Sequence, residues 1–267
     1  DYLFIGQETL KDYLKIKIKP KEIIIKNKTG EKAMLGKSFF KIAVLVIISF
    51  AAITTFGQKG AAAMEVSEEK IIKLPEPEHD SSTSLEQTLL KRRSQRSYAE
   101  TPLSLKEVSQ LLWAAQGFTN KQGFRTAPSA GALYPLEIFV AAGNVQDLKH
   151  GIYRYLPKAH SLRPEIDGDK RKELWSEGLR QSPIRQAPAV FVITGVFDRT
   201  RSKYGKRGQQ YVFMEAGHAA QNLCLQSVSL DIGAVTIGAF NDSGVARILG
   251  LDKNTTPLYL LPVGKKD

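Results

Sequence analysis

Residues 211–230 read YVFMEAGHAAQNLCLQSVSL, and this stretch decides the fold class. Apolar and small residues occur on every side of the helix that it predicts, which runs from about Gln209 to Leu230. A helix without a wet face has to be covered all round, either in a hydrophobic core or in an interface between subunits. The sequence therefore predicts a long helix that is buried on every side.

Shorter elements are predicted before and after this helix. Runs rich in Val, Ile, Tyr and Phe predict strands, and these lie at 136–142, 151–156, 189–197, 234–237 and 258–263. Capping boxes at Ser84 and Ser104 begin two helices, and the predicted helices besides the long one are 85–92, 105–116, 169–179 and 243–249. Asp242 is the expected N-cap of the last helix. Because helices and strands alternate irregularly, the fold class is α+β.

The first 57 residues are predicted to hold a leader. Lys37 and Lys41 precede an apolar run from Ile42 to Ile53, which makes residues 34–57 resemble a secretory signal peptide. This run is shorter than the ~20 residues that span a bilayer. We therefore expect cleavage and an exported, periplasmic protein, with an inner-membrane anchor through residues 39–57 as the alternative.

The segments on either side of this leader differ from it in character. Residues 1–33 exceed what a signal peptide needs ahead of its apolar run, and Met34 stands where an initiator would be expected. We expect residues 1–33 to be a non-native upstream extension, with a cytoplasmic tail on a signal anchor as the alternative. Residues 58–84 are small, charged and interrupted by proline, which predicts a linker. Residues 85–267 then form the folded domain.

The net charge of +11 would ordinarily suggest nucleic acid or an anionic membrane as a partner. Residues 1–57 carry +5 of this charge, and only +6 is spread over the remaining chain. We therefore expect no nucleic-acid partner, and a membrane contact only if the leader is retained. Cys224 is the single cysteine, and with four scattered histidines a metal site is not expected.

Four short motifs could carry chemistry. Three arginines and a serine in KRRSQRSY (91–98) can bind a phosphate or polarise a carbonyl by charge-assisted hydrogen bonds. RTAPSAGALYPLE (125–137) brackets small residues between prolines, so a flat ligand could approach its backbone. KYGKRG (203–208) precedes the long helix, and TIGAF (236–240) precedes PLYLLPVGKK (257–266).

Taken in this order, the four motifs resemble the nitroreductase family, and particularly its SagB-type (thiazole/oxazole oxidase-like) branch, over about 180 residues from Leu85 onward. The resemblance implies a nitroreductase-like fold with a mostly antiparallel central sheet flanked by helices. It also implies a homodimer whose interface contains the long helix, with FMN bound between the subunits.

The resemblance further assigns residues to the site. Contacts to FMN would come from the arginine cluster, the small-residue loop, the segment facing flavin N5 and the C-terminal phosphate contact. These residues are Arg92, Arg93, Ser94 and Arg96; Pro128, Ser129, Ala130, Gly131, Leu133 and Tyr134; Ile237 and Gly238; and Gly264, Lys265 and Lys266. Lys203 and Tyr204 match the proton-transfer pair of azoline oxidases in this branch, so they are the expected catalytic residues.

These assignments imply an FMN-dependent oxidoreductase. It would dehydrogenate a small organic or peptide-derived, azoline-like substrate by hydride transfer to flavin N5. An exported protein would have no NAD(P)H pool, which favours oxygen or a quinone as the electron acceptor. The alternatives are an NAD(P)H-dependent nitro/quinone reductase and a catalytically silent flavin-fold binding protein.

Overall fold

A computed structural model of the chain describes residues 15–19, 22–26, 32–34 and 71–267. It divides into two units, Asp1–Val66 and Ser67–Asp267. The first unit holds an antiparallel sheet of order β1-β2-β3, formed by β1 (Lys15–Lys19), β2 (Glu22–Lys26) and β3 (Lys32–Met34). The rest of residues 1–33, the predicted leader beyond Met34 and the first part of the predicted linker lie outside the described residues. In the part of the chain that is described, no helix has both the length and the apolar character to cross a membrane.

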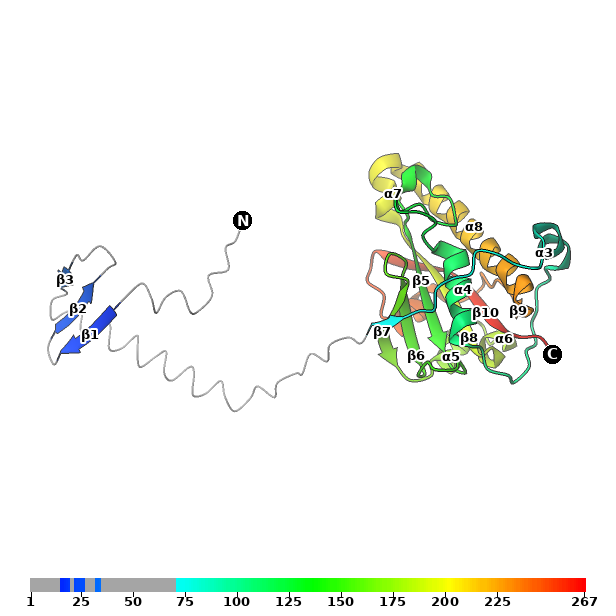
Figure 1. Cartoon of the computed structure of the whole chain (residues 1–267), viewed down its shortest axis with the longest axis horizontal. Helices are drawn as coiled ribbons and strands as arrows, with labels where there is room; N and C mark the ends of the chain where they lie inside the picture. The colour runs from blue at the N-terminus through cyan, green and yellow to red at the C-terminus, as the bar shows by residue number, and fades with distance from the viewer. Residues whose placement is uncertain (1–14, 20–21, 27–31, 35–70) are drawn as a thin grey trace. The chain divides into compact units, whose positions relative to one another are not determined.

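An antiparallel sheet of seven strands is the centre of the second unit (Figure 1). Its strand order is β4-β7-β6-β5-β8-β10-β9. The strands are β4 (Ile72–Lys73), β5 (Leu136–Ala142), β6 (Gly151–Leu156), β7 (Ser161–Asp167), β8 (Ala189–Val196), β9 (Ile232–Ala234) and β10 (Thr255–Lys265). The predicted fold class, an antiparallel sheet flanked by helices, is confirmed.

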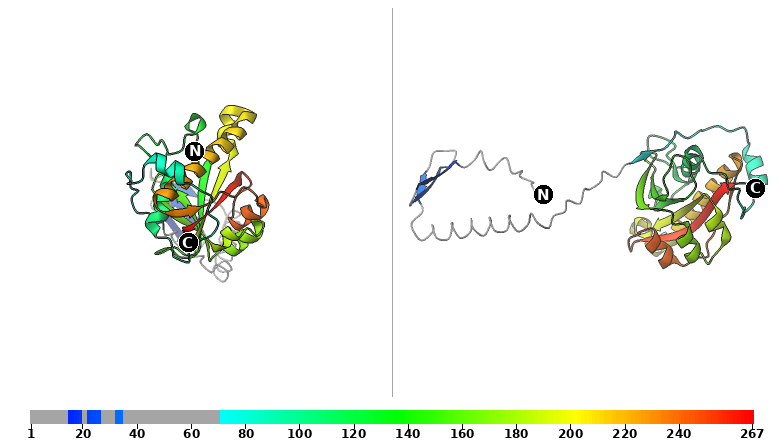
Figure 2. Two further views of the ribbon diagram at one scale, coloured as in Figure 1. Left: turned by 90° about the vertical axis from the view of Figure 1, so that its right-hand side faces the viewer. Right: turned by 90° about the horizontal axis from the view of Figure 1, so that it is seen from below.

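Helices cover both faces of this sheet (Figure 2). They are α3 (Leu85–Lys91), α4 (Leu105–Gln116), α5 (Arg171–Glu177), α6 (Ser182–Gln186), α7 (Phe197–Tyr204), α8 (Gly208–Ser229) and α9 (Asp242–Ile248), with short 3-10 turns η2 (Ala130–Ala132) and η3 (Gly205–Arg207). Alternate residues of β5 serve two cores, because successive side chains of a strand point to opposite faces. Ile138 and Val140 pack in the core that contains α4 and α8, whereas Phe139 and Ala141 pack with α5, α6 and α9.

The long helix α8 forms where the sequence predicts it, but in the single chain it is not covered on every side. Val212, Ala216 and Leu223 are buried against the sheet and α4. Phe213 and Met214 are 49% and 51% exposed. These two side chains, which we call the exposed stripe of α8, are therefore uncovered in one copy of the chain, whereas the exposed His218 and Gln221 further along the helix are polar.

The predicted capping box at the start of α4 is present. Ser104 Oγ accepts a hydrogen bond from the Glu107 backbone N–H at 3.2 Å, and Glu107 Oε2 accepts one from the Ser104 N–H at 2.9 Å. Together they satisfy two of the N–H groups that a helix start leaves unpaired.

Replacing Ser104 with alanine is expected to lower the free energy of unfolding by about 1 kcal/mol, the usual cost of losing an N-cap side chain. Urea unfolding monitored by far-UV circular dichroism measures the change. Ser202→Ala is a matched control, since the Ser202 hydroxyl only donates back to Arg199 O inside α7. An equal loss in both variants would contradict a specific capping role for Ser104.

Several predicted boundaries are wrong. The predicted strand 189–197 ends at Val196, because Phe197 begins α7. The predicted strand 234–237 is β9 ending at Ala234, followed by an isolated bridge from Ile237 to Leu260. Asn241, not Asp242, caps α9, because its side chain accepts from the Gly244 N–H.

The described end of the segment predicted as a linker lies on the domain. Ile72 and Lys73 pair with β7 as β4, and Leu74 is 2% exposed within the main core. Glu78 continues the contact, since its backbone N–H donates to Gln110 Oε1 of α4 at 2.8 Å.

Candidate flavin site

The loop between α4 and β5 contains an unusual backbone. Gly131, Ala132 and Tyr134 have φ values of 62°, 53° and 45°, a region that favours glycine. A Cβ at position 131 would lie 2.9 Å from Tyr204 Oη and 3.1 Å from Lys203 Nζ. The structure therefore brings the small-residue loop and both predicted catalytic residues together, with two polar side-chain ends against the Gly131 backbone.

Side chains hold this loop in shape from within. Ser129 Oγ accepts a hydrogen bond from the Tyr134 N–H at 2.9 Å, and Tyr134 Oη accepts one from the Arg125 N–H at 3.2 Å. The Arg125 guanidinium lies 4.5 Å from the centroid of the Tyr134 ring. Ser129, Ala130 and Gly131 are not fully buried, so a planar ligand has access to their backbone.

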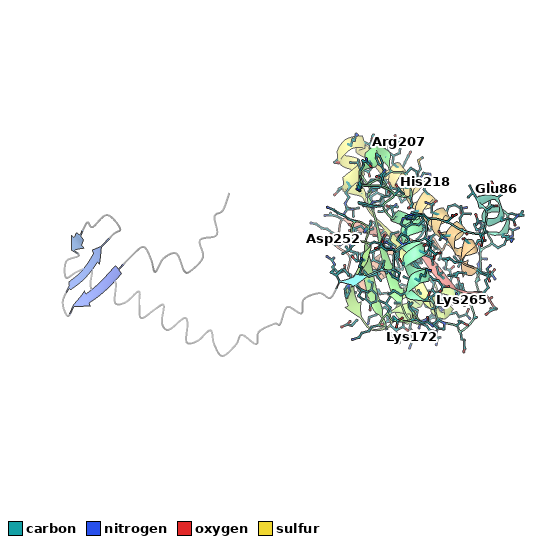
Figure 3. All side chains as sticks on the ribbon, in the orientation of Figure 1. Glu86, Lys172, Arg207, His218, Asp252 and Lys265 are labelled. Atoms are coloured by element: carbon teal, nitrogen blue, oxygen red, sulfur yellow. The ribbon has the colours of Figure 1, made fainter. Side chains whose placement is uncertain are left out.

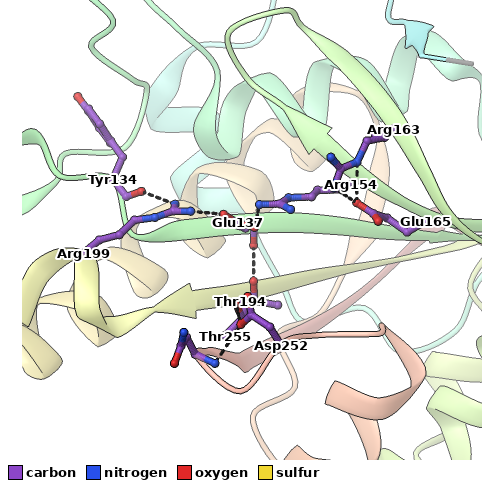
Figure 4. A network of polar contacts seen from close by, with 10 residues as sticks. Tyr134, Glu137, Arg154, Arg163, Glu165, Thr194, Arg199, Asp252 and Thr255 are labelled. Carbon is purple, nitrogen blue, oxygen red and sulfur yellow. Dashed lines mark hydrogen bonds and ion pairs between the residues drawn. The ribbon is translucent and has the colours of Figure 1, made fainter. Parts of the chain in front are cut away.

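An ion-pair network attaches α7 to the same loop (Figure 4). Arg199 donates to Tyr134 O at 3.3 Å and pairs with Glu137 of β5, whose other carboxylate oxygen pairs with Arg154 of β6. Arg199 stands one helical turn before Lys203, so the two side chains share a face of α7. The network thus fixes the helix that carries Lys203 relative to the loop.

Glu215 of α8 lies behind the loop and is 3% exposed. Burial raises the pKa of the Glu215 carboxyl to about 7, although a hydrogen bond with Ser129, the charge of Arg125 and Gln116 all act to lower it. Sequence reasoning assigned no role to this residue. The available signal was that Glu215 is the only acidic residue between positions 208 and 229.

The arginine cluster lies in a different place. Arg92 follows α3, Ser94 forms a parallel bridge with Ala234, and the Gln95 N–H donates to Ala234 O at 3.0 Å. The guanidiniums of Arg93 and Arg96 contact only backbone carbonyls nearby. Among the described residues no carboxylate pairs with the cluster, so its positive charge is available to a phosphate.

The C-terminal residues reach the arginine cluster but are engaged elsewhere. Lys265 pairs with Glu107, and Lys266 pairs with Asp231 at 2.6 Å. A Cβ on Gly264 would lie 2.8 Å from Cγ of the Tyr98 ring, so glycine is needed there for close packing. Both predicted phosphate-binding lysines would have to exchange a carboxylate for the ligand.

Ile237 and Gly238 form a third group. Ile237 is 5% exposed and belongs to the second core, and both its N–H and its C=O are hydrogen-bonded to Leu260, so Gly238 is the residue of this pair that could present its backbone to a ligand. Gly238 is exposed and borders a cavity of about 670 Å³ whose wall also includes Phe213 and Tyr259.

The loop and the arginine cluster lie at opposite ends of the sheet. At one end Gly195 pairs with Leu136, just after the loop and just before α7. At the other end Val263 pairs with Ala234, the residue that bridges to Ser94. Since β10 extends by ~3.3 Å per residue, roughly 20 Å separates these ends. Figure 1 shows α7 far from α3 and the C-terminus, and Figure 3 likewise places Arg207 far from Lys265.

The two groups match different parts of a flavin mononucleotide. The loop offers small residues and exposed backbone suited to a flat ring, and the arginine cluster offers unpaired cations suited to a phosphate. The residues present therefore fit FMN, and in one chain the two groups lie at opposite ends of the sheet. In the part described, no cluster of His, Cys, Asp and Glu could hold a metal ion.

Comparison with known proteins identifies the family of the chain. The nitroreductase family model matches residues 89–265. MJ1384 of Methanocaldococcus jannaschii, which its name assigns to the nitroreductases, is 45% identical over 195 residues, covering 73% of this chain and 96% of that protein. The microcin B17-processing protein McbC of Escherichia coli is 28% identical over 159 residues, covering 57% of this chain and 58% of McbC.

A solved structure shows the same architecture. The crystal structure of a Ralstonia eutropha protein, also assigned by name to the nitroreductases, superimposes with a TM-score of 0.65 at 29% identity. The match covers 75% of this chain and 91% of that one. The chain belongs to the nitroreductase family, whose members are in general flavin-dependent oxidoreductases.

Proposed function

We propose that this protein is an FMN-dependent oxidoreductase of the SagB type, which dehydrogenates a small organic or peptide-derived, azoline-like substrate. One observation supports this most directly. Lys203 Nζ and Tyr204 Oη converge on the backbone of Gly131, in the loop that would lie against the flavin. Dehydrogenation removes one hydride and one proton from adjacent atoms, so it requires a proton acceptor beside the flavin, and either side chain could serve. The similarity to McbC, a peptide-processing protein by its name, favours the same substrate class.

In this proposal the phosphate and the ring of FMN have separate binding groups. Arg92, Arg93 and Arg96 bind the ribityl phosphate or the pyrimidine oxygens together with Ser94, and the 264–266 segment assists. Residues 128–131 with Leu133 and Tyr134 line the ring, and the backbone of Gly238 faces N5, next to Ile237, which holds this segment against β10. A fixed arginine beside the pyrimidine favours the negative charge that reduction places there.

A second copy of the chain would bring these groups together. The loop of one protomer would meet the arginine cluster of its partner, because the two groups lie at opposite ends of the sheet in one chain. The exposed stripe of α8 with Phe213 and Met214, and the exposed Leu85, Leu89 and Leu90 of α3, supply apolar surface for such a homodimer.

The chemistry divides between the flavin and this chain. Bound FMN supplies the hydride acceptor. Lys203 and Tyr204 take the proton from the carbon next to the one that loses hydride, so that a ring C=C bond forms and a proton and a hydride both leave the substrate. Arg199 holds α7 so that this pair stays over Gly131.

The leader favours an exported, periplasmic location, or an anchor in the inner membrane if residues 39–57 are retained. In that compartment the electrons would pass to oxygen or to a quinone. The 45% identity to a protein named as a nitroreductase favours a second candidate, an NAD(P)H-dependent nitro/quinone reductase. Steady-state NADPH oxidation by the purified protein would support that candidate.

Flavin retention tests the proposal directly. The purified protein should be yellow and dimeric, and Arg92→Ala and Arg93→Ala should each weaken FMN binding by about 1.5–3 kcal/mol, the value of a hydrogen bond to a charged group. This corresponds to a dissociation constant roughly 10- to 150-fold higher, measured by fluorescence titration.

Lys172→Ala is the matched control, because it removes one exposed positive charge from α5. A colourless monomer that refuses added FMN would contradict both the cofactor and the assigned residues.

A further inference from the structure

Glu215 is a buried ionisable group for which the proposed reaction has no use. It lies in the middle of α8, and its Oε1 atom has no hydrogen-bond partner among the described residues. Leaving a buried polar atom without a hydrogen bond costs free energy. The groups around Glu215 should therefore explain why a carboxyl is present at this position.

Those surroundings connect Glu215 to the loop. The Ser129 hydroxyl lies near the Glu215 carboxyl and acts to lower its pKa. Ser129 Oγ also accepts the N–H of Tyr134 and so closes the segment that contains Gly131. A serine hydroxyl has one hydrogen to donate and two lone pairs. Ser129 can therefore donate to an ionised Glu215 or accept from a protonated one without losing Tyr134.

Arg125 supplies positive charge opposite the Glu215 carboxyl, but its guanidinium is also engaged by other groups. Arg125 faces Glu215, but its Nη1 donates to Gln116 Oε1 at 2.8 Å and its plane covers the Tyr134 ring. Within the described part of the chain, neither Arg125 Nε nor Gln116 Nε2 has a hydrogen-bond partner, although Gln116 lies beside Glu215. Among the described residues, Glu215, Arg125 and Gln116 thus each keep a buried polar atom without a hydrogen bond behind the loop.

Three further charged or titratable residues act on Arg125 and not directly on Glu215. Tyr134 of the loop, Tyr155 of β6 and Arg199 of α7 face Arg125. Arg199 is paired with Glu137, and Tyr155 bonds to His160 Nδ1 at 2.8 Å. Burial outweighs Ser129, Arg125 and Gln116 and leaves the pKa of Glu215 at about 7. Both charge states are therefore accessible near neutral pH.

We propose that Glu215 is a positioning residue for the flavin-facing loop, and that its negative charge, when present, disfavours electron uptake by FMN bound against that loop. This rests on the proposed function, since it concerns a flavin held at residues 128–134. Reduction places negative charge on the ring, and a second negative charge behind the loop repels it strongly because little water screens the two.

The reduction potential of the FMN-loaded full chain tests this, followed against reference dyes from about pH 5.5 to about pH 8.5, on either side of the Glu215 pKa. Glu215→Gln imitates the neutral carboxyl and keeps its shape. Wild type and variant are expected to have the same potential below about pH 6, where Glu215 is neutral in the wild type. Above about pH 7 the wild-type potential should become more negative than that of the variant, and the gap should widen with pH.

Two further variants sharpen the result. Ser227→Ala is the control, since Ser227 is a buried residue of the same helix whose hydroxyl bonds only to Cys224 O. Its potential should run parallel to the wild type at every pH. Ser129→Ala removes a hydroxyl that lowers the pKa of Glu215, so the potential of this variant should depart from that of Glu215→Gln only at a higher pH. It also provides the test if Glu215→Gln does not fold.

The outcomes separate this inference from the proposed function. A protein that holds FMN but shows parallel curves for wild type and Glu215→Gln, or a constant offset at all pH values, would overturn the role of Glu215 alone. A wild-type chain that does not bind FMN would overturn the proposed function, and the role of Glu215 with it.

Discussion

Replacing Lys203 with methionine is expected to slow dehydrogenation of an azoline substrate by two to four orders of magnitude while the protein keeps its flavin. A positioned proton-transfer group contributes about 10²–10⁴-fold to a rate. Methionine retains most of the length of the lysine side chain but cannot accept a proton. Lys203 is exposed at the last turn of α7, so its replacement should leave the stability of the fold unchanged.

Anaerobic bleaching of the flavin by a small thiazoline measures this rate. Lys206→Met is the control, because Lys206 is an exposed lysine in η3, just beyond the end of α7. Equal bleaching rates for wild type and Lys203→Met would remove Lys203 from the mechanism. A variant that loses thiazoline oxidation but still oxidises NADPH would show two activities with different needs for a proton acceptor.

Introducing a charge on the exposed stripe of α8 is expected to dissociate the proposed dimer and release its flavin. Met214→Glu would place an uncompensated carboxylate in the interface of each protomer. The cost of burying such a charge is several kcal/mol, which weakens association by roughly a thousandfold or more. Because the loop and the arginine cluster lie at opposite ends of one chain, a monomer should also lose FMN.

Gel filtration and the visible absorption of the flavin report the two effects together. Leu179→Glu makes the same kind of change at a side chain that is 64% exposed and lies outside α8 and α3, and it should leave the protein dimeric and yellow. A Met214→Glu protein that remained a flavin-loaded dimer would mean that α8 does not form the interface.

Elements whose signals are local could be predicted from the sequence. β5 and β6 occupy their predicted ranges, and α4 begins at its predicted capping box. In each case the apolar pattern and the cap residues lie within the element itself. The strand β7 was missed because its sequence SLRPEID holds a proline and alternating charges, and it is recognised as a strand only beside β6.

The helix α7 shows why tertiary contacts were needed. Its sequence FDRTRSKY has little apolar periodicity, and only Phe197 and Thr200 are buried. Arg199 secures it through Glu137 and Tyr134 O, both more than sixty positions earlier in the chain. No local sequence pattern predicts such a long-range contact.

The candidate site was predicted in its parts and not in its arrangement. The motifs named Gly131, Lys203 and Tyr204, and the structure brings them together. Which end of the sheet each motif reaches depends on strand order, and the sequence does not contain that order in any local form. The raised pKa of Glu215 likewise depends on its burial in the folded chain. A single acidic residue in the sequence of α8 does not show which elements would bury it.

The two outermost strands of the seven-stranded sheet are its shortest. β4 has two residues and β9 has three, and β7, next to β4, contains Pro164, which has no N–H to offer a neighbouring strand. Short, interrupted edges of this kind discourage a sheet from growing by strand addition, and so protect against aggregation. The edges of this sheet therefore offer few free backbone groups to a second copy of the chain.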